Sequence, residues 1–485
     1  MKRFTPFLLS GIIALAACAD DPTALAPSSA VPSFSESEEG GTYLVRFKGN
    51  GVPAGFASDV AALGGEVIFA HEVGIAAVGG LSEAAAGQLA GSSTIAAVDA
   101  DAYVELPSAA EASMEAAESE PASPAAPATA LRYNRQWNLH TIQAKTAWDA
   151  GHKGNPSVKV GVLDSGVDWL HPDLVGRVDM ALSRSFLSAA ENARVTSTWG
   201  ASTPLFADLH YHGTHVAATV ASNAYIYAGV ASNLTLVSLK VCAPGTPANG
   251  FQGSCPTSSV LNAILYAADN GIPVINMSLG GFFSRRAASA AGGFGPSFLA
   301  TINQVFNYAH RKGTTVVVAA GNSAMDMDHN GNIYNSYCNA AHVICVSATG
   351  PTGAASLTGP WTNIDALAGY SNYGSSAVTV AGPGANAVAV SAACSGFTIV
   401  TSLLACRNRF FNSPTSWSAF SIGLNGTSMA SPHVAGLAGL IVSDGTSQPS
   451  QVRARIQSSA DDLGPAGTDP AYGKGRINVA RAFGL

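Results

Sequence analysis

The chain is poor in charged side chains. Only 11% of its 485 residues are Asp, Glu, Lys or Arg, whereas 47% are hydrophobic and 51 are glycine. A chain of this length and composition can bury a large core around a parallel sheet. Its solubility then depends on Ser, Thr and Asn, which is typical of an exported protein. We expect a monomer without a nucleic-acid partner.

Long hydrophobic runs are absent after the N-terminus. Met1-Lys2-Arg3 and the apolar run from Phe7 to Ala17 predict a signal peptide over residues 1–18, too short to anchor the chain as a membrane span. Its end, Leu15-Ala16-Ala17-Cys18, has two interpretations. It resembles the lipobox of bacterial lipoproteins, in which the cysteine is lipidated, or it is cut by signal peptidase, for instance after Ala16. Both predict an extracytoplasmic protein, either lipid-anchored in a bacterial cell envelope or secreted.

Cysteine is also scarce, with seven in the chain. No Cys-x-x-Cys motif or Cys/His cluster is present, which disfavours a metal site. Without Cys18, six cysteines remain, and an even number in an exported protein indicates disulfides. Six cysteines allow fifteen pairings. We favour pairing of neighbours, which gives Cys242 with Cys255, Cys338 with Cys345, and Cys394 with Cys406.

A serine among small residues begins an apolar helix in the run Gly426-Thr427-Ser428-Met429-Ala430-Ser431-Pro432-His433. Pro432 is tolerated only in the first turn of a helix, so the helix should begin near Ser428. Unpaired backbone N–H groups at that end would stabilise an anionic tetrahedral intermediate. We therefore predict that Ser428 is a nucleophile and that its own N–H helps to form an oxyanion site.

Two upstream segments supply the other groups that a serine nucleophile needs. The segment Val158–Leu163 is typical of a buried strand and ends at Asp164, on the sheet edge where open α/β folds bind ligands. A second apolar helix begins at His212-Gly213-Thr214-His215. We predict that His212 is the base and that Asp164 orients it. The order Asp, His, Ser is that of subtilisin and differs from that of α/β-hydrolases, in which serine comes first.

These segments resemble the signature motifs of the subtilisin-like (subtilase, S8) serine peptidases. Val316–Asn322 resembles a fourth motif, and the resemblance implies that the Asn322 amide donates to the oxyanion. Further similarity, at Trp137–Leu139, Ile275–Gly281 and Tyr472–Val479, extends it over residues 131–485. It implies a three-layer α/β/α fold with a mostly parallel sheet, and a serine endopeptidase that needs no cofactor for its chemistry.

In this family the substrate lies extended between two enzyme strands. Ser278-Leu279-Gly280 resembles one of them and Leu239–Ala243 the opposing one, while Ala319-Ala320-Gly321 resembles the floor of the first specificity pocket. These residues are mainly apolar or small and include no carboxylate. They predict protein or peptide substrates that are cut after large apolar residues.

Calcium commonly binds such enzymes, and the run Asp326–Asn332 matches the first half of an EF-hand loop. The twelfth position is Tyr337 where a glutamate is needed, so we favour a solvated loop, with structural Ca²⁺ as the alternative. His215 and His433 lie about one helical turn after the two catalytic positions. We interpret them as packing or hydrogen-bonding residues.

The N-terminal part contains one more module. Residues 19–41 are typical of a flexible tether. Residues 42–106 predict a β-α-β-β-α-β order, with strands at 42–47, 66–70, 74–78 and 94–98 (or on to 104) and helices at 53–63 and 82–89, as in a ferredoxin-like fold. Placed before a subtilase, this module resembles the inhibitory propeptide (I9) of the family, and an unrelated small binding domain is the alternative. Residues 107–130, rich in Ala, Glu and Pro, form a linker without a core-forming pattern.

Charge divides unevenly along the chain. Residues 1–130 contain 16 acidic and 4 basic side chains, a net charge of −12, and residues 131–485 contain 15 acidic and 20 basic ones, a net charge of +5. We therefore predict an autoprocessed endopeptidase whose propeptide inhibits it within the same chain. The non-enzyme alternative is a catalytically inactive subtilase-fold protein that binds peptides at the cell surface.

Overall fold

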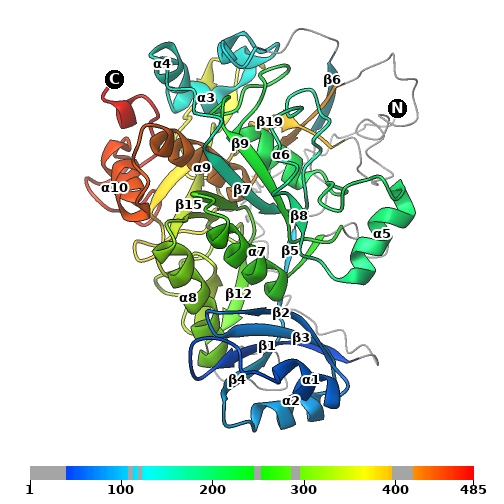
Figure 1. Cartoon of the computed structure of the whole chain (residues 1–485). Coiled ribbons are helices and arrows are strands. Elements are labelled where there is room, and N and C mark those ends of the chain that lie inside the picture. Colours follow the sequence, from blue (N-terminus) through cyan, green and yellow to red (C-terminus); the bar gives the residue numbers. More distant parts are fainter. Residues whose placement is uncertain (1–39, 107–112, 118–122, 245–252, 286–294, 396–418) are drawn as a thin grey trace, which may run out of the picture. The chain divides into compact units, whose positions relative to one another are not determined.

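A seven-stranded sheet lies at the centre of the C-terminal part of the chain (Figure 1). The computed structural model describes residues 40–106, 113–117, 123–244, 253–285, 295–395 and 419–485. Every pair of neighbouring strands in this sheet is parallel. The order is β18-β15-β13-β11-β7-β9-β8, formed by β7 (Lys159–Asp164), β8 (Arg184–Ser185), β9 (Thr235–Lys240), β11 (Val274–Met277), β13 (Thr315–Ala319), β15 (Ile344–Thr349) and β18 (Val380–Pro383).

Helices cover both faces of this sheet. Side chains alternate along each strand, so Val160 and Val162 of β7 belong to one buried cluster and Leu163 belongs to the other. The first cluster includes residues of α6 (His212–Val220), α9 (Thr427–Ser443) and α10 (Pro449–Ser459), and the second includes residues of α7 (Thr257–Asp269) and α8 (Pro296–Arg311). The predicted three-layer α/β/α architecture is confirmed. Three further helices are α3 (Trp137–Thr141), α4 (Ala144–Asp149) and α5 (Ala189–Trp199).

Residues 41–100 form a separate small core under a four-stranded antiparallel sheet. The elements are β1 (Gly41–Phe47), α1 (Phe56–Ala62), β2 (Glu66–His71), β3 (Ile75–Leu81), α2 (Glu83–Ala90) and β4 (Ile95–Ala100), in the predicted chain order. The strand order β2-β3-β1-β4 is that of a ferredoxin-like fold. The last predicted strand is interrupted. After β4 the chain leaves this sheet and forms β5 (Tyr103–Leu106), which pairs with β10 (Gly253–Pro256) instead.

The linker over residues 107–130 contains ordered structure that its composition did not predict. Ser113–Ala117 form strand β6, which pairs with β20 (Ala419–Leu424), and β20 also pairs with β19 (Val390–Ala393). A short 3₁₀ helix covers Pro127–Thr129, and Ala130 is buried in the main core. These residues are ordered because of long-range pairing and packing, which a local composition does not reveal.

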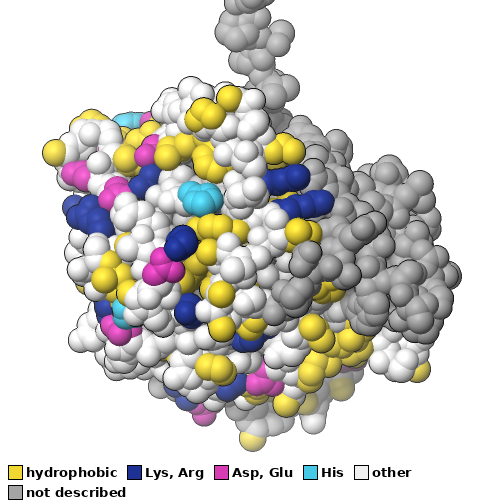
Figure 2. Space-filling view, turned by 90° about the horizontal axis from the view of Figure 1, so that it is seen from above, with side chains coloured by type: hydrophobic (Ala, Val, Ile, Leu, Met, Phe, Trp, Pro, Cys, Tyr) yellow, Lys and Arg dark blue, Asp and Glu magenta, His cyan; other side chains and the backbone are white. Residues whose placement is uncertain are grey.

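Charged side chains are sparse on the face shown in Figure 2, where uncharged surface separates most of them. This matches the low charge content of the sequence.

The remaining short strands form two small antiparallel pairs, β12 (Gly281–Ser284) with β14 (Ile333–Ser336) and β16 (Gly353–Ala354) with β17 (Trp361–Thr362). Within the described residues, no helix has the length and apolar character needed to span a bilayer. The predicted signal peptide, Cys18 and tether lie outside the described residues.

Candidate active site

Strand β7 and helix α6 bring an aspartate and a histidine together. Asp164 is the last residue of β7 and His212 the first of α6, and both side chains are buried. Nδ1 of His212 lies 2.8 Å from Oδ1 and 3.0 Å from Oδ2 of Asp164. Burial acts to lower the pKa of His212, but the charge and hydrogen bond of Asp164, together with the charge of Asp208, outweigh it and raise that pKa above its ordinary value.

Close backbone packing fixes the start of α6. A Cβ atom at Gly213 would lie only 2.1 Å from the carbonyl oxygen of Gly166, so no larger residue fits there without movement of the backbone. Tyr211, just before the helix, has a φ of 105°, a conformation that non-glycine residues rarely adopt. The position of His212 is therefore determined by a contact between the first turn of α6 and the loop after β7.

Asp208 is a second buried carboxylate near His212, and no sequence motif indicated it. Its hydrogen bonds join the loop after β7 to the first turn of α6. It accepts from Ser165 Oγ (2.9 Å), from the backbone N–H groups of His210 (2.8 Å), Tyr211 (3.0 Å) and Thr214 (2.9 Å), and from Thr214 Oγ1 (2.6 Å). Ser165 Oγ in turn accepts from the N–H of Gly213 at 3.0 Å.

Ser428 is the second residue of α9, and its hydroxyl group forms no hydrogen bond with His212 in the part of the chain that the structure describes. Its Oγ donates to the carbonyl oxygen of Ser278 at 3.1 Å, whereas Nε2 of His212 is buried without a hydrogen-bond partner among the described residues. Helix α9 packs against both α6 and β7. The three predicted residues thus lie on elements in mutual contact, with the Ser428 hydroxyl held on a carbonyl oxygen.

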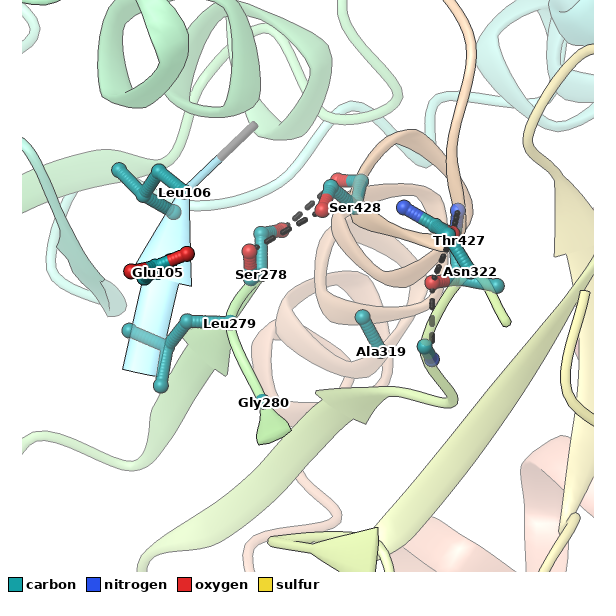
Figure 3. Close-up of a pocket in the computed structure, with 10 residues that line it drawn as sticks. Glu105, Leu106, Ser278, Leu279, Gly280, Ala319, Asn322, Thr427 and Ser428 are labelled. Atoms are coloured by element: carbon teal, nitrogen blue, oxygen red, sulfur yellow. Dashed lines mark hydrogen bonds between the residues drawn. The ribbon is translucent and has the colours of Figure 1, made fainter. Parts of the chain in front are cut away.

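Asn322 is fixed next to Ser428 by the start of α9. Its Oδ1 accepts hydrogen bonds from the N–H (2.9 Å) and the Oγ1 (2.8 Å) of Thr427. The amide nitrogen is thereby directed toward Ser428 (Figure 3). Gly426 leaves space for it, because a Cβ there would lie 3.2 Å from Nδ2 of Asn322. This geometry leaves an N–H donor available beside the serine.

A pocket of about 250 Å³ lies beside Ser428 (Figure 3). Its lining includes seven residues that the sequence suggested for the site, together with Thr427: Ser278, Leu279, Gly280, Ala319, Gly321, Asn322 and Ser428. Ala320 is instead buried in the core, where its carbonyl oxygen accepts from Asn335 Nδ2 (2.7 Å) and Asn372 Nδ2 (2.8 Å). Glu105 and Leu106 of β5 complete the lining, and the sequence did not indicate that they would reach this pocket.

Strand β5, which lines the pocket together with Ser278–Gly280, pairs with β10 and not with the predicted segment Leu239–Ala243. Most of that segment belongs to β9 in the central sheet, and only its end, Ala243, pairs with Ser254 of β10. Strand β10 is the one that pairs with β5. The disulfide between Cys242 and Cys255 joins β10 to the end of this segment. The strand that pairs with β5 is therefore β10, which lies next to the end of the predicted segment.

The structure also pairs Cys338 with Cys345. Cys394 is disulfide-bonded, and Cys406 lies outside the described residues.

In the EF-hand-like loop, Asp328 accepts from the backbone N–H groups of Ser375 (2.7 Å) and Ser376 (3.0 Å). Over the described residues there is no group of three or more His, Cys, Asp or Glu arranged to hold a metal ion.

His215 and His433 are buried hydrogen-bonding residues. His215 Nε2 lies 2.9 Å from the carbonyl oxygen of Val390, and burial lowers the pKa of His215 to about 3. His433 contacts the carbonyl oxygen of Met429 (2.7 Å) and Asn138 Nδ2 (2.8 Å), and burial lowers its pKa to about 4. Both imidazoles are therefore neutral near pH 7, as expected of packing residues.

The sequence and the fold are similar to those of known proteins. Residues 155–475 match the model of the subtilase family, Peptidase_S8. Thermitase of Thermoactinomyces vulgaris is 32% identical over 356 residues, which cover 72% of this chain and 96% of thermitase. Subtilisin DY of Bacillus licheniformis is 32% identical over 356 residues, covering 71% of this chain and 97% of the relative.

Two solved structures share the fold. The epidermin leader peptide processing serine protease of Staphylococcus aureus superposes with a TM-score of 0.66 at 19% identity, covering 92% of this chain and 98% of that one. Fervidolysin of Fervidobacterium pennivorans, a keratinolytic enzyme related to subtilisin, has a TM-score of 0.62 at 20% identity, covering 93% of this chain and 62% of that one.

Proposed function

Because the chain belongs to the subtilase family and is a serine-type endopeptidase, we propose that Asp164, His212 and Ser428 form its catalytic triad. The observation that best supports this is the buried Asp164–His212 pair, whose free Nε2 lies on a helix packed against the helix of Ser428. Asp164 accepts a hydrogen bond from the Nδ1–H of His212, and so leaves Nε2 as the basic nitrogen.

In the reaction, the hydroxyl of Ser428 leaves the carbonyl oxygen of Ser278 and turns to Nε2 of His212. Oγ attacks the substrate carbonyl carbon while His212 takes the hydroxyl proton, and His212 then gives that proton to the departing amine. Water, deprotonated by His212, cleaves the acyl-enzyme in the same way. The amide of Asn322 and the N–H of Ser428, at the positive end of α9, stabilise the negative oxygen of each tetrahedral intermediate.

Hydrolysis of casein by the purified mature protein tests this function. An inactive peptide-binding protein built on the same fold would bind peptides without cleaving them. The presence of all four functional groups in one site favours the enzyme. Absence of cleavage by the folded mature chain would support the binding protein.

We also propose that the enzyme cuts after large apolar residues. Leu279 and Ala319 give the pocket an apolar wall, and among the residues that the structure describes its only ionisable lining residue is Glu105, which belongs to the N-terminal module. A pocket without its own carboxylate offers no partner for a lysine or arginine side chain. A peptide-library profile dominated by Lys or Arg before the cut would contradict this specificity.

Residues 42–106, the N-terminal module, are proposed to be an inhibitory propeptide. Its strand β5 adds to β10 and lines the pocket beside Ser428, where a substrate would bind. Two carboxylates of the module also bind at the N-termini of catalytic-domain helices. Asp101 accepts from the N–H (3.0 Å) and Oγ (2.5 Å) of Ser258 on α7, and Asp99 accepts from Ser297 Oγ on α8 (2.5 Å). Inhibition by this module, added to the mature enzyme, is the test.

Export and lipid anchoring are proposed from residues 1–18 alone. Because the proposed self-cleavage would remove these residues, N-terminal sequencing and the intact mass of the uncleaved Ser428→Ala precursor, expressed in its own host, distinguish the two processing routes. A precursor that begins at Cys18 with the added mass of a lipid supports the anchor, and one that begins at Cys18 or elsewhere without added lipid supports secretion.

A further inference from the structure

The linker strand β6 is bound to a strand that leads directly into the nucleophile. Strand β20 has β19 on one side and β6 on the other, and it ends at Leu424, four residues before Ser428. The pairing of β6 with β20 is antiparallel over five residue pairs, from Ser113 with Gly423 to Ala117 with Ala419. The outer edge of β20 therefore binds a polypeptide close to the proposed catalytic serine.

Two strands of the same N-terminal segment thus bind near the proposed catalytic serine, β5 at the pocket beside it and β6 on the strand that precedes it. Strand β5 runs toward the site, because its last residue, Leu106, lines the pocket beside Ser428. Strand β6 runs away from the site, because its first residue pairs with the end of β20 nearer to Ser428 and its last residue pairs with the far end. A substrate chain would run in the same directions: toward the serine before the cleaved bond, and away from it after the bond.

We propose that the edge of β20 is a strand-addition site for the polypeptide downstream of the cleaved bond, and that Ser113–Ala117 occupies it in the precursor. The inference rests on the proposed function as an autoprocessed protease. With both flanking strands bound, self-cleavage is directed to the stretch between Leu106 and Ser113. Seven residue steps span at most roughly 25 Å, which restricts the part of the chain that can reach Ser428.

Backbone hydrogen bonds provide this binding. An open sheet edge presents unpaired N–H and C=O groups, and a strand with almost any sequence can satisfy them. Ser421, Ile422 and Gly423 are buried where β6 pairs with them, so their edge is protected from water in the precursor. Anchoring a chain on both sides of a bond also lowers the entropy lost when that bond is positioned for attack. The linker strand therefore defines where the precursor is cut.

Two adjacent prolines in β6 test the role of this strand. In an antiparallel edge strand, alternate residues donate their N–H to the neighbouring strand, so Glu115→Pro with Ala116→Pro must remove a donor. The matched control, Glu115→Ala with Ala116→Ser, keeps both N–H groups. Self-cleavage of the purified precursor is followed over time, the new N-terminus is identified by mass spectrometry, and kcat/KM for a short peptide is measured after maturation.

The proline pair should slow self-cleavage about tenfold and spread the new N-termini beyond residues 107–113, while the control and the peptide kcat/KM stay unchanged. An unchanged rate and a single unchanged N-terminus in the proline variant would overturn the proposal. If the wild-type precursor does not cut itself but the mature enzyme cleaves peptides, then self-processing is refuted while the proposed peptidase activity stands.

A crosslink tests the strand pairing itself, even if the proline variant does not fold. In the Ser428→Ala precursor, Ala116→Cys with Phe420→Cys places two cysteines at directly paired positions. Ala117→Cys with Phe420→Cys shifts the pair by one residue and serves as the control. Peptide mapping should show a crosslink mainly in the first variant. Absence of the crosslink, or equal crosslinking in both, would refute the register on which the inference depends.

Discussion

Ser428 is the residue on which both hydrolysis and maturation are proposed to depend. Ser428→Ala removes the nucleophile, so we expect a loss of roughly a millionfold in kcat and an intact precursor. Activity on a short peptide and the size of the purified chain measure the two effects. If Ser428→Ala is processed normally in a protease-free preparation, another enzyme must mature this protein.

His212 determines the acidic side of the pH profile. Because its pKa is raised in the folded protein, the imidazole gains a proton at a higher pH than an ordinary histidine, and kcat/KM should begin to fall above pH 6.5 as the pH is lowered. Asp208→Asn removes one of the negative charges that raise this pKa. The acidic limb of Asp208→Asn should therefore move to lower pH.

A matched control is Asp149→Asn, because Asp149 is exposed on α4 and contacts Lys145. Its pH profile should follow that of the wild type. If Asp208→Asn lowers activity equally at all pH values without moving the limb, then Asp208 acts only through the structure of the loop and not through its charge.

Gly213 tests the packing that positions His212. Gly213→Ala would force the backbone away from the carbonyl oxygen of Gly166, and we expect a loss of about 1–3 kcal/mol in the free energy of unfolding and a lower kcat. Gly369→Ala is the control, since Gly369 is exposed and has no atom within 4 Å of the added methyl group. Denaturant unfolding of both variants in the Ser428→Ala background measures the difference.

At the residue scale, short motifs predicted the groups at the ends of buried strands and helices. Asp164, His212 and Ser428 each occur in a local pattern of small and apolar residues that marks such an end. Asp208 has no such pattern. Its partners come from the loop after β7 and from the start of α6, so its importance depends on a contact between distant segments.

At the scale of elements, carboxylates of the propeptide module meet the N-termini of two helices. Burial raises the pKa of Asp101 to about 6, so the docked carboxyl group binds a proton more readily than the free one. Docking of the module should therefore strengthen as the pH falls from about 6 toward 4. Calorimetric titration of the module into the Ser428→Ala catalytic chain measures this trend.

Asp101→Asn removes the titrating group while it keeps an oxygen that can accept from Ser258. Docking of the module that carries Asp101→Asn should depend less on pH than docking of the wild-type module. Asp99, whose pKa is also raised by burial, accounts for part of the remaining dependence. An identical pH dependence of docking in the wild type and in Asp101→Asn would show that the proton is taken up elsewhere.

Strands were predicted well where their own sequence is apolar and poorly where a partner determines them. Strands β7 and β13 of the central sheet contain several β-branched residues, as at Val316–Val318, which indicate a buried strand. Strand β10 (Gly-Ser-Cys-Pro) and strand β6 (Ser-Met-Glu-Ala-Ala) have no such signal. Each forms because another strand offers it an edge, and this depends on the fold of the whole chain.

At the scale of the whole molecule, the unequal distribution of charge gives the last prediction. The N-terminal 130 residues carry −12 and the rest of the chain +5, although the total is only −7. One consequence is that the acidic segment helps to keep the precursor soluble. A second is that it is attracted to its own catalytic domain and associates with it faster. Such attraction between exposed charges is screened over about 8 Å at physiological salt.

The rate at which the segment Thr42–Ala130 inhibits the mature enzyme distinguishes the two consequences. If attraction matters, the association rate should fall as salt rises, whereas dissociation should change little. Deleting residues 107–130 removes four acidic side chains and no basic one, so it should weaken the salt dependence while the strand β5 contacts remain. An association rate that is the same at low and high salt would leave solubility as the role of these charges, because the inhibitor would then find its site by diffusion alone.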